Sequence, residues 1–335
     1  MSELRRINQI TSQMSFYIGS FNMYKYSAFE SNEESRKDVS RIAQVIRDAQ
    51  FDIVALQEVF SAEAVNRIAR ALGENWKWSW ASPPSYSKVA AEGYGFIWNT
   101  NRFDLANYDG IKREPAIFNQ YRIDISSGQR PLIRNPYYGR FVPTFMDLRV
   151  ELRLINAHIL FSKTSSESDE TLKNEPSALA MRRNEFRVLA SALYPKLEDR
   201  VYGNNVKAYT ILLGDYNLNL KQSFAFGSYL SGRLEPESIM LYDGHSVKEI
   251  ITVQEDLTTL KKNPPDGSQS VDITNPTCWA NNYDHFTYDK RLFEGVLIRA
   301  SRVNSLDYCA DYNEHRKVIS DHVPIRLEID LRNGK

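Results

Sequence analysis

Residues 51–59 read FDIVALQEV, an apolar run that ends in polar residues and carries Glu58 near its end. An apolar run of this length is typical of a buried strand. Residues 35–49, which precede it, and residues 62–72, which follow it, place their apolar side chains at helical spacing. The segment therefore predicts a helix–strand–helix unit with a carboxylate at the end of the strand.

The same alternation of strands and helices continues along the chain. Further strands are expected at residues 14–21, 94–99, 140–148, 149–159, 208–213, 283–288 and 323–329. Residues 176–194 form a third helical pattern, whereas residues 107–136 and 261–282 are rich in turn-forming residues and are predicted to be loops. Strands interleaved with helices indicate a layered α/β fold. We expect one domain over residues 15–330, behind an N-terminal extension of residues 1–14.

The composition of the 335 residues is that of an ordinary globular protein. The 42 basic and 42 acidic residues cancel, which counts slightly against a polynucleotide substrate because nucleic-acid-binding proteins are often basic. A local basic patch with bound metal can still hold phosphate. Cys278 and Cys309 are too few for a disulfide framework and are expected to be reduced thiols. The sequence has no signal-like or membrane-spanning stretch, so we expect a cytoplasmic protein without a membrane partner.

Polar residues recur where the apolar strands end. They are Asn22, Glu58, His158, Asp215, Asn217, Asp284, Asp321 and His322. Any one of them has a simple structural explanation, since a carboxylate after a strand is usually a turn residue or a helix cap. Their repetition along the chain favours a shared site, because strand ends on one rim of a sheet converge in space.

The residue types in this set agree with one kind of chemistry. Carboxylates and amides offer hard oxygen ligands, which suit Mg²⁺ and also Mn²⁺ or Ca²⁺. Cysteine is absent from the set, which argues against a thiolate zinc site. Two histidines near carboxylates can act as general acid and base, and an arginine would stabilise phosphate charge. Together these residues indicate phosphodiester hydrolysis.

The motifs that contain these residues resemble a known family. Residues 15–329 resemble the endonuclease/exonuclease/phosphatase superfamily, which includes deoxyribonuclease I. The motifs are SFNMY at 20–24, LQEV at 56–59, NAH at 156–158, GDYN at 214–217, YD at 283–284 and SDHVP at 320–324, in the family's order. The resemblance implies a four-layer α/β/β/α sandwich, with two mainly antiparallel sheets packed face to face and helices outside.

The resemblance also implies a metal site. Glu58 would be the principal metal ligand, with Asn22 beside it, and Asp321 would complete the carboxylate cluster. Asp215 and Asn217 would bind metal or hold the scissile phosphate and the attacking water. The expected cofactor is Mg²⁺, with Mn²⁺ or Ca²⁺ as alternatives.

Two histidine–carboxylate pairs follow from the same resemblance. His322 would pair with Asp284, and His158 would pair with a glutamate. The segment EGYGFIW at 92–98 resembles the deoxyribonuclease segment that supplies this glutamate, which nominates Glu92.

The phosphate-binding arginine can come from two segments. KREPAIF at 112–118 has the closer tetrapeptide to deoxyribonuclease I, whereas LIRNPYYGRF at 132–141 keeps the whole ten-residue frame. The second segment also leads directly into the strands that end at the NAH motif. We therefore assign phosphate binding to Arg134 and Arg140, and we expect Arg113 on a solvated loop.

One residue of the sequence differs from deoxyribonuclease I in a way that leaves the substrate open. Phe60 stands where that enzyme has a DNA-contacting arginine. The expected substrate is DNA, with RNA, abasic DNA, a phosphoinositide or another small phosphoester as alternatives, and a catalytically silent binding module as an alternative of another class. A cytoplasmic deoxyribonuclease would need restraint, so a regulatory protein partner is an open hypothesis.

Three other histidines are expected at solvated loop positions: His245, His285 and His315. Three alternating tryptophans could stack bases but are expected to pack half-buried on a strand: Trp76, Trp78 and Trp80.

Overall fold

The computed structural model of the chain describes residues 15–28, 37–83, 92–108, 111–119, 122–125, 128–145, 150–161, 177–202, 206–220, 224–225, 228–229, 232–242, 246–262 and 278–331. The predicted N-terminal extension, residues 1–14, and His245 lie outside these residues, as does most of the predicted loop 261–282. No helix in the described part of the chain has the length and apolar character needed to cross a membrane.

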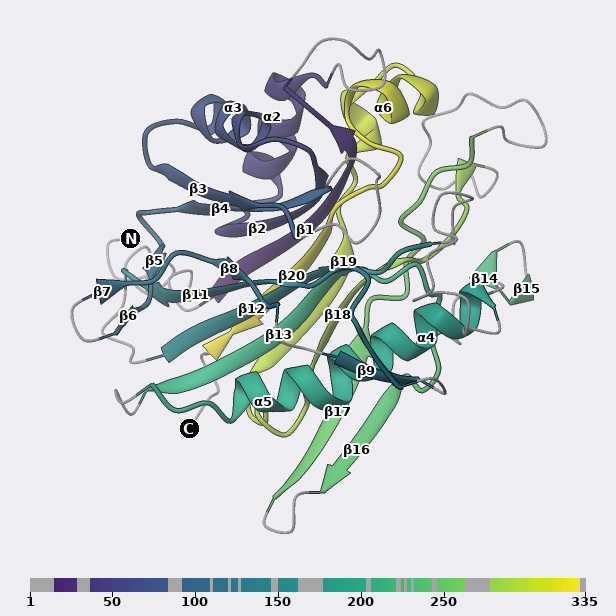
Figure 1. Ribbon diagram of the computed structural model, residues 1–335. Coiled ribbons are helices and arrows are strands. Elements are labelled where there is room, and N and C mark those ends of the chain that lie inside the picture. Colours follow the sequence, from purple (N-terminus) through teal and green to yellow (C-terminus); the bar gives the residue numbers. More distant parts are fainter. Residues whose placement is uncertain are drawn as a thin grey trace.

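Two large sheets form the centre of the fold (Figure 1). The six-stranded sheet has the order β19 (Leu297–Arg302), β20 (Ile325–Asp330), β1 (Ser15–Tyr26), β2 (Ile53–Val59), β4 (Gly93–Asn99) and β3 (Trp76–Ala81). The eight-stranded sheet has the order β16 (Ser238–Tyr242), β17 (Val247–Val253), β18 (Asp284–Asp289), β13 (Lys207–Asp215), β12 (Val150–His158), β11 (Tyr137–Pro143) and β5 (Phe103–Leu105), with β8 (Ala116–Ile117) also on β11. One strand pair in each sheet is parallel, β1 with β2 and β12 with β13, so the sheets are mixed.

Helices cover the outer face of each sheet. α2 (Val39–Asp48) and α3 (Ala62–Leu72) pack on the six-stranded sheet, and their ends agree with the predicted helices to within a few residues. The third predicted helix is divided into α4 (Ala178–Val188), a π-helical turn η2 (Leu189–Leu193) and α5 (Tyr194–Glu198), which pack on the eight-stranded sheet. Near the C-terminus, η4 (Leu306–Tyr308) and α6 (Tyr312–Val318) precede β20. The result is the expected four-layer sandwich.

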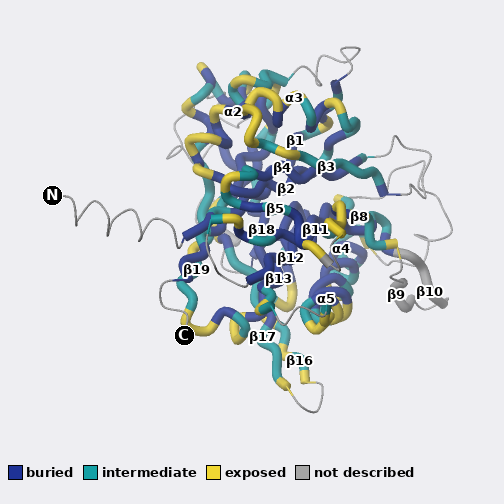
Figure 2. The backbone as a smooth tube through the Cα atoms, turned by 90° about the vertical axis from the view of Figure 1, so that its left-hand side faces the viewer, coloured by how far each residue is buried: buried dark blue, intermediate teal, exposed yellow. Residues whose placement is uncertain are grey.

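Three apolar clusters hold the layers together, and Figure 2 shows the buried backbone concentrated in the sheets. The middle cluster lies between the sheets. In it, Phe96 of the six-stranded sheet stacks on Tyr137 of the other sheet at 5.1 Å between ring centroids and meets Phe141 edge-on at 5.4 Å. Contacts of this kind bury large aromatic area and fix how the two sheets face each other. They therefore set the spacing between strand ends that come from different sheets.

The segment predicted to be a loop, residues 107–136, contains several short strands. They are β6 (Asn107–Tyr108), β7 (Ile111–Lys112), β8, β9 (Arg122–Ile125) and β10 (Gly128–Pro131). Each is too short to show a periodic pattern in sequence, which is why turn-forming residues dominated the prediction. A further short pair, β14 (Phe224–Ala225) with β15 (Ser228–Tyr229), lies after the GDYN motif. Cys278 and Cys309 are both buried and unbridged.

Candidate active site

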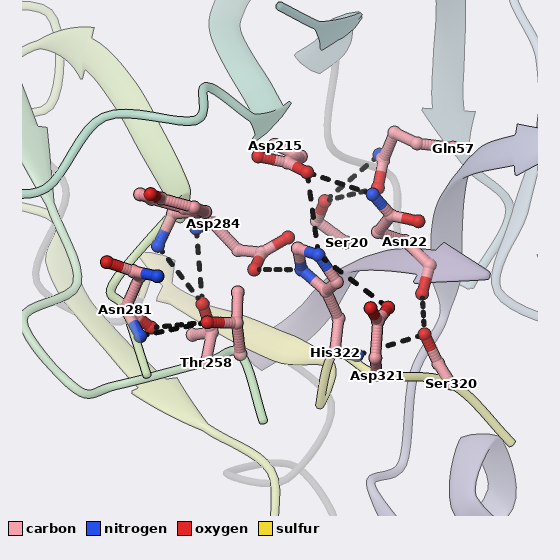
Figure 3. Close-up of polar contacts among 12 residues, drawn as sticks. Ser20, Asn22, Gln57, Asp215, Thr258, Asn281, Asp284, Ser320, Asp321 and His322 are labelled. Atoms are coloured by element: carbon pink, nitrogen blue, oxygen red, sulfur yellow. Dashed lines mark hydrogen bonds and ion pairs between the residues drawn. The ribbon is translucent and has the colours of Figure 1, made fainter. Parts of the chain in front are cut away.

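A cavity of about 770 Å³ opens where strands of both sheets end. Most of the predicted site residues line it: Glu58, Glu92, Arg134, His158, Asp215, Asn217, Asp321 and His322. Asn22 and Asp284 are buried and reach the cavity residues through hydrogen bonds (Figure 3). The structure thus gathers into one place residues that lie up to 300 positions apart (22 to 322) in the sequence.

Glu58 interrupts the regular backbone of β2. Its φ of 55° is a left-handed value that is uncommon for a residue with a side chain. The register between β2 and β4 shifts between Leu56 and Val59, as a β-bulge would produce. The bulge turns the Glu58 carboxylate into the cavity, while Gln57 beside it donates to Asn156 Oδ1 of the opposite sheet at 2.8 Å.

Gly214 allows β13 to lie close to β12 at the point where both strands end. Its φ is 139°, and a Cβ at this position would lie 1.8 Å from the carbonyl oxygen of Ala157. A side chain cannot be accommodated without moving one of the two strands. The glycine therefore keeps the pairing regular as far as His158 and Asp215, which are directly opposite each other.

Asn22 joins the carboxylates of two sheets. Its Nδ2 donates to Glu58 Oε1 at 3.0 Å and to Asp215 Oδ2 at 2.9 Å, and its Oδ1 accepts from the backbone nitrogen of Tyr24 at 2.9 Å. The amide oxygen thus has a backbone donor, and the amide nitrogen faces the carboxylates. Asn22 was predicted to be a metal ligand; in this orientation its amide nitrogen positions two carboxylates.

His322 and Asp284 form the first of the two expected pairs. His322 Nδ1 donates to Asp284 Oδ2 at 2.8 Å, and Nε2 lies 3.6 Å from Asp215 Oδ2 (Figure 3). Burial alone would lower the pKa of His322, but the negative charges of Asp284 and Asp215 outweigh it and raise the pKa well above its ordinary value. The surroundings therefore favour the protonated imidazole, with one ring nitrogen facing the cavity.

His158 and Glu92 form the second pair, with Arg134 bound to both. His158 Nδ1 lies 3.2 Å from Glu92 Oε2, and Arg134 Nη2 donates to Glu92 Oε1 at 2.7 Å. Arg134 Nη1 lies 3.0 Å from Nδ1 and 3.1 Å from Nε2 of His158. Burial would raise the pKa of Glu92, but the close approach of His158 and the charge of Arg134 lower it. Glu92 is therefore ionised and orients the imidazole.

Asp215 lies between the two histidines. Its Oδ2 is 3.7 Å from His158 Nε2 and 3.6 Å from His322 Nε2. Burial raises the pKa of Asp215 to about 6, although the charge of His322 acts in the opposite direction. A carboxylate with a pKa near neutrality can both accept and release a proton under physiological conditions.

The carboxylates also fit a hard divalent cation. Glu58, His158 and Asp215 bring one ligand atom each to within 4.8 Å of one another. Asp321 lines the same cavity, and its Oδ1 is buried with no hydrogen-bond partner among the described residues. Burial raises the pKa of Asp321, as expected for a buried carboxylate that lacks sufficient donors. The oxygen atoms of Glu58, Asp215 and Asp321 provide the donor set that Mg²⁺ or Mn²⁺ prefers.

Comparison with solved structures shows which known fold the chain shares. No family model matches the chain, and no curated protein matches it in sequence. An endonuclease/exonuclease/phosphatase family protein from Bacteroides thetaiotaomicron matches in structure with a TM-score of 0.53 and 15% identity, over 94% of this chain and 97% of that one. The chain has the endonuclease/exonuclease/phosphatase fold. A mannosyl-6-phosphatase from the same organism (TM-score 0.54, 14% identity, 94% and 99% covered) and TDP2 from C. elegans (0.50, 13%, 94% and 75%) share it.

Within this endonuclease/exonuclease/phosphatase fold, Arg140 lies outside the site. Its side chain is 5% exposed and forms a two-pronged ion pair with Glu151, at 2.9 and 2.6 Å, on the helix-covered side of β11. Tyr137 and Phe141 face the cluster between the sheets, so strand alternation directs Arg140 to the opposite face. The assignment of Arg140 to phosphate binding was wrong, whereas Arg134, just before β11, lines the cavity and Arg113 is exposed, as expected.

Two histidines that were expected in solvated loops are buried. His285 is in β18, where Nε2 lies 2.7 Å from the carbonyl oxygen of Leu218. His315 is in α6, where Nδ1 lies 2.7 Å from the carbonyl oxygen of Ser320. The loop prediction for both was wrong, because nearby turn signals reveal nothing about burial in the tertiary structure. The tryptophans of β3 are half-buried, as predicted, and pack near the helices on the six-stranded sheet.

A polar network beneath the cavity was not predicted. Asn156 Nδ2 donates to the carbonyl oxygens of Leu56, at 3.0 Å, and Gly95, at 3.3 Å, so it connects β12 to the opposite sheet. Ser320 Oγ donates to the carbonyl oxygen of Asn22 at 2.6 Å and accepts from the backbone nitrogen of His322 at 3.0 Å (Figure 3). These residues hold the strand ends that carry the reactive groups. Asn156 and Ser320 stand inside the NAH and SDHVP motifs, and that position was the available signal.

Proposed function

We propose that the protein is a divalent-metal-dependent phosphoesterase that hydrolyses phosphodiester bonds, with DNA as the substrate of an endonuclease reaction. The observation that carries the proposal is the pair of imidazoles, His158 and His322, that flank Asp215, each held by its own carboxylate. In-line hydrolysis needs a proton acceptor for water on one side of the phosphorus and charge stabilisation on the other. Two separately oriented imidazoles around one carboxylate meet both needs.

The proposed reaction divides the roles between the two sides of the cavity. Asp215, with its pKa of about 6, accepts the proton of the attacking water, and Asn217 orients the phosphate. His322 is protonated and donates from Nε2 towards the leaving oxygen. On the other side, Arg134 and His158 donate to the non-bridging oxygens as negative charge develops on them.

A divalent cation would be held by Glu58 and Asp321, with Asp215 beside it. When bound, it polarises a non-bridging phosphate oxygen and neutralises part of its charge. Asn22 keeps Glu58 and Asp215 together, because its amide nitrogen donates to both. Mg²⁺ is the proposed ion, because the ligands are oxygen atoms, and Mn²⁺ or Ca²⁺ would fit the same donors.

The test is nicking of supercoiled plasmid with Mg²⁺ and with EDTA. We expect Mg²⁺-dependent nicking that EDTA abolishes and that His158→Ala, His322→Ala and Glu58→Gln each reduce by at least about a hundredfold. Circular dichroism would show that each variant remains folded. Full activity in any folded variant would refute the assignment of this site.

A matched pair of arginine variants tests the phosphate-binding role. Arg134 lies in the cavity and Arg113 lies on an exposed segment, and both were candidates in the sequence. We expect Arg134→Ala to lower kcat by about a hundredfold, as loss of a transition-state donor does, and Arg113→Ala to leave it unchanged. RNA, an abasic duplex and a phosphoinositide run beside plasmid as substrates. If one of these substrates is turned over faster than plasmid, the DNA assignment is refuted, whereas the assignment as a phosphoesterase stands.

The setting of the enzyme follows from its substrate. We propose a cytoplasmic enzyme restrained by a regulatory protein partner, since a free deoxyribonuclease would damage the DNA of its own cell. Expression of the wild-type protein should be toxic, and expression of His158→Ala should not be. Equal tolerance of both proteins would count against a DNA substrate.

A further inference from the structure

Phe161 is an exposed aromatic residue at the edge of the cavity. It follows the end of β12 by three residues, lines the cavity, and is 51% exposed. Four other large apolar side chains are comparably exposed among the described residues, and none lines this cavity: Ile111, Val201, Met240 and Tyr242. A single exposed apolar residue is common on protein surfaces, so exposure alone carries little weight. The contacts that hold Phe161 in place are stronger evidence.

A buried arginine supports the ring of Phe161. The guanidinium carbon of Arg182, in α4, lies 4.7 Å from the ring centroid. Nη1 of Arg182 donates to the carbonyl oxygen of Asn217 at 2.7 Å, and the side chain is hydrogen-bonded to Tyr283. Burial of an arginine is costly unless its donors are satisfied. Here Nη1 donates to a cavity residue while Nε has no hydrogen-bond partner among the described residues, so the same side chain that supports Phe161 also anchors the turn carrying Asn217.

Tyr283 completes a corner formed by two rings. Its ring centroid is 6.2 Å from that of Phe161, with 49° between the ring planes, and Tyr283 also lines the cavity. The guanidinium lies over the ring of Phe161, and the 51% exposure of the residue leaves surface for a planar ligand. Asn217, which touches both Arg182 and the reactive cluster, lies between this corner and His158, whose Nε2 is 3.5 Å from Asn217 Nδ2. A group stacked on Phe161 would therefore be a neighbour of the phosphate being cleaved.

We propose that Phe161, with Tyr283 beside it, is a stacking platform for the heterocyclic base next to the scissile phosphate. The inference rests on the proposed function and adds the residues that would contact a base of the substrate. Aromatic side chains accept any base, because every base has a π-face, so the platform selects for a base without reading its identity. Arg182 acts as a positioning residue, which holds the ring from behind. Trp76 and Trp78, the stacking candidates in the sequence, line a different depression beside Asp104 and Lys112.

The test compares two phosphodiesters with the same leaving group. Thymidine 5′-(p-nitrophenyl phosphate) carries a base, and methyl p-nitrophenyl phosphate does not. We expect the full chain with Mg²⁺ to prefer the thymidine ester. Phe161→Ala should lower kcat/KM for that ester by about tenfold, the effect of losing one base stack, and leave the methyl ester unchanged. Phe161→Tyr should keep the preference, because a phenol ring stacks equally well.

Tyr242→Ala is the matched control. Tyr242 is 75% exposed on β16 and lies outside the cavity, so its loss removes an exposed aromatic ring without touching the platform. Tyr242→Ala should leave kcat/KM unchanged for both esters. If Phe161→Ala lowers kcat/KM equally for both esters, or for neither, the stacking platform is refuted while the hydrolase assignment stands. No hydrolysis of either ester by a wild-type protein that also fails to nick plasmid would refute the proposed function instead.

A binding measurement tests whether Phe161 stacks on a base, even if the protein proves to be inactive. Adenosine 5′-monophosphate and ribose 5-phosphate carry the same phosphate and differ by the base. Calorimetry should show about tenfold tighter binding of the nucleotide by the wild-type protein, and equal binding of the two by Phe161→Ala. Equal binding of both ligands by the wild-type protein would refute the platform.

Discussion

His315 should make the stability of the protein fall steeply in mild acid. The residue is fully buried in α6, and its two ring nitrogens have different partners. Nδ1 faces the carbonyl oxygen of Ser320, which can only accept, so Nδ1 carries the proton. Nε2 lies 2.8 Å from Ser305 Oγ and therefore accepts from that hydroxyl. A second proton on the ring would have to displace this hydrogen bond in a site without solvent.

The size of the effect follows from the pKa of His315. Burial lowers this pKa from 6.5 to about 3. Between these values the unfolded chain carries a proton on His315 and the folded chain does not, so the free energy of unfolding decreases as the pH falls through this window. From pH 7 to pH 5 the loss is about 2 kcal/mol from this one group, and the ceiling over the whole window is about 5 kcal/mol.

Urea unfolding of the wild-type protein and His315→Gln at pH 7 and pH 5 measures this loss. Carboxylates also contribute to the pH dependence, so the informative quantity is the difference between the two proteins. The wild-type protein should lose about 2 kcal/mol more than the variant over this interval. Ser305→Ala removes the donor to Nε2 and should destabilise the protein by similar amounts at pH 7 and pH 5, because His315 of the folded chain is neutral at both. Parallel losses in the wild-type protein and His315→Gln would refute the reasoning.

Three further predictions concern the strand ends and the interior. Because burial raises the pKa of Asp215 to about 6, the affinity for Mn²⁺ measured by calorimetry should fall as the pH drops through 6, and Asp215→Asn should flatten that dependence; a flat wild-type profile would contradict this. Gly214→Ala places a Cβ 1.8 Å from the oxygen of Ala157 and should cost more than about 3 kcal/mol in urea unfolding; near-wild-type stability would be inconsistent with the close approach. Glu151→Gln leaves the charge of Arg140 buried without a carboxylate and should destabilise by about 3–5 kcal/mol with kcat per folded molecule unchanged; a specific loss of kcat would place this pair in the reaction.

The sequence predicted the elements that have a strong periodic pattern. α3 begins and ends at the expected residues, and the buried strands β2 and β12 lie within one or two residues of their predicted ranges. Helix and strand patterns of this length are dictated by one-sided or complete burial, which the sequence records directly. The short strands between residues 107 and 136 exist only because they pair with one another or with β11, and pairing between distant residues leaves no local pattern.

The two arginines of the LIRNPYYGRF segment show what a motif frame leaves out. Both were assigned to phosphate on their position in the frame, yet Arg134 reaches Glu92 and Arg140 reaches Glu151. The five residues between them cross from an irregular segment into β11, where side chains alternate between the two faces of a sheet. The face of Arg140 follows from its register with β12, which pairs it with Arg153. That register is a tertiary property, so the frame could not separate the two roles.

Alternation along the strands also explains why the site lies at one end of the sandwich. In β12, Leu152 and Leu154 face the core between the sheets, and the same parity continues to Asn156 and His158. The other central strands follow this course: Tyr209, Ile211 and Leu213 lead to Asp215, and Phe16 and Ile18 lead to Ser20 and Asn22. The reactive residues are therefore core positions whose side chains change from apolar to polar at one end of the sheets. Glu58 is out of step with Ile53 and Ala55, and the bulge at its left-handed backbone position corrects the parity. A cavity built by continuing the core in this way has rigid walls on both sides, which favours the orientation of groups that must hold a phosphate while protons are transferred around it.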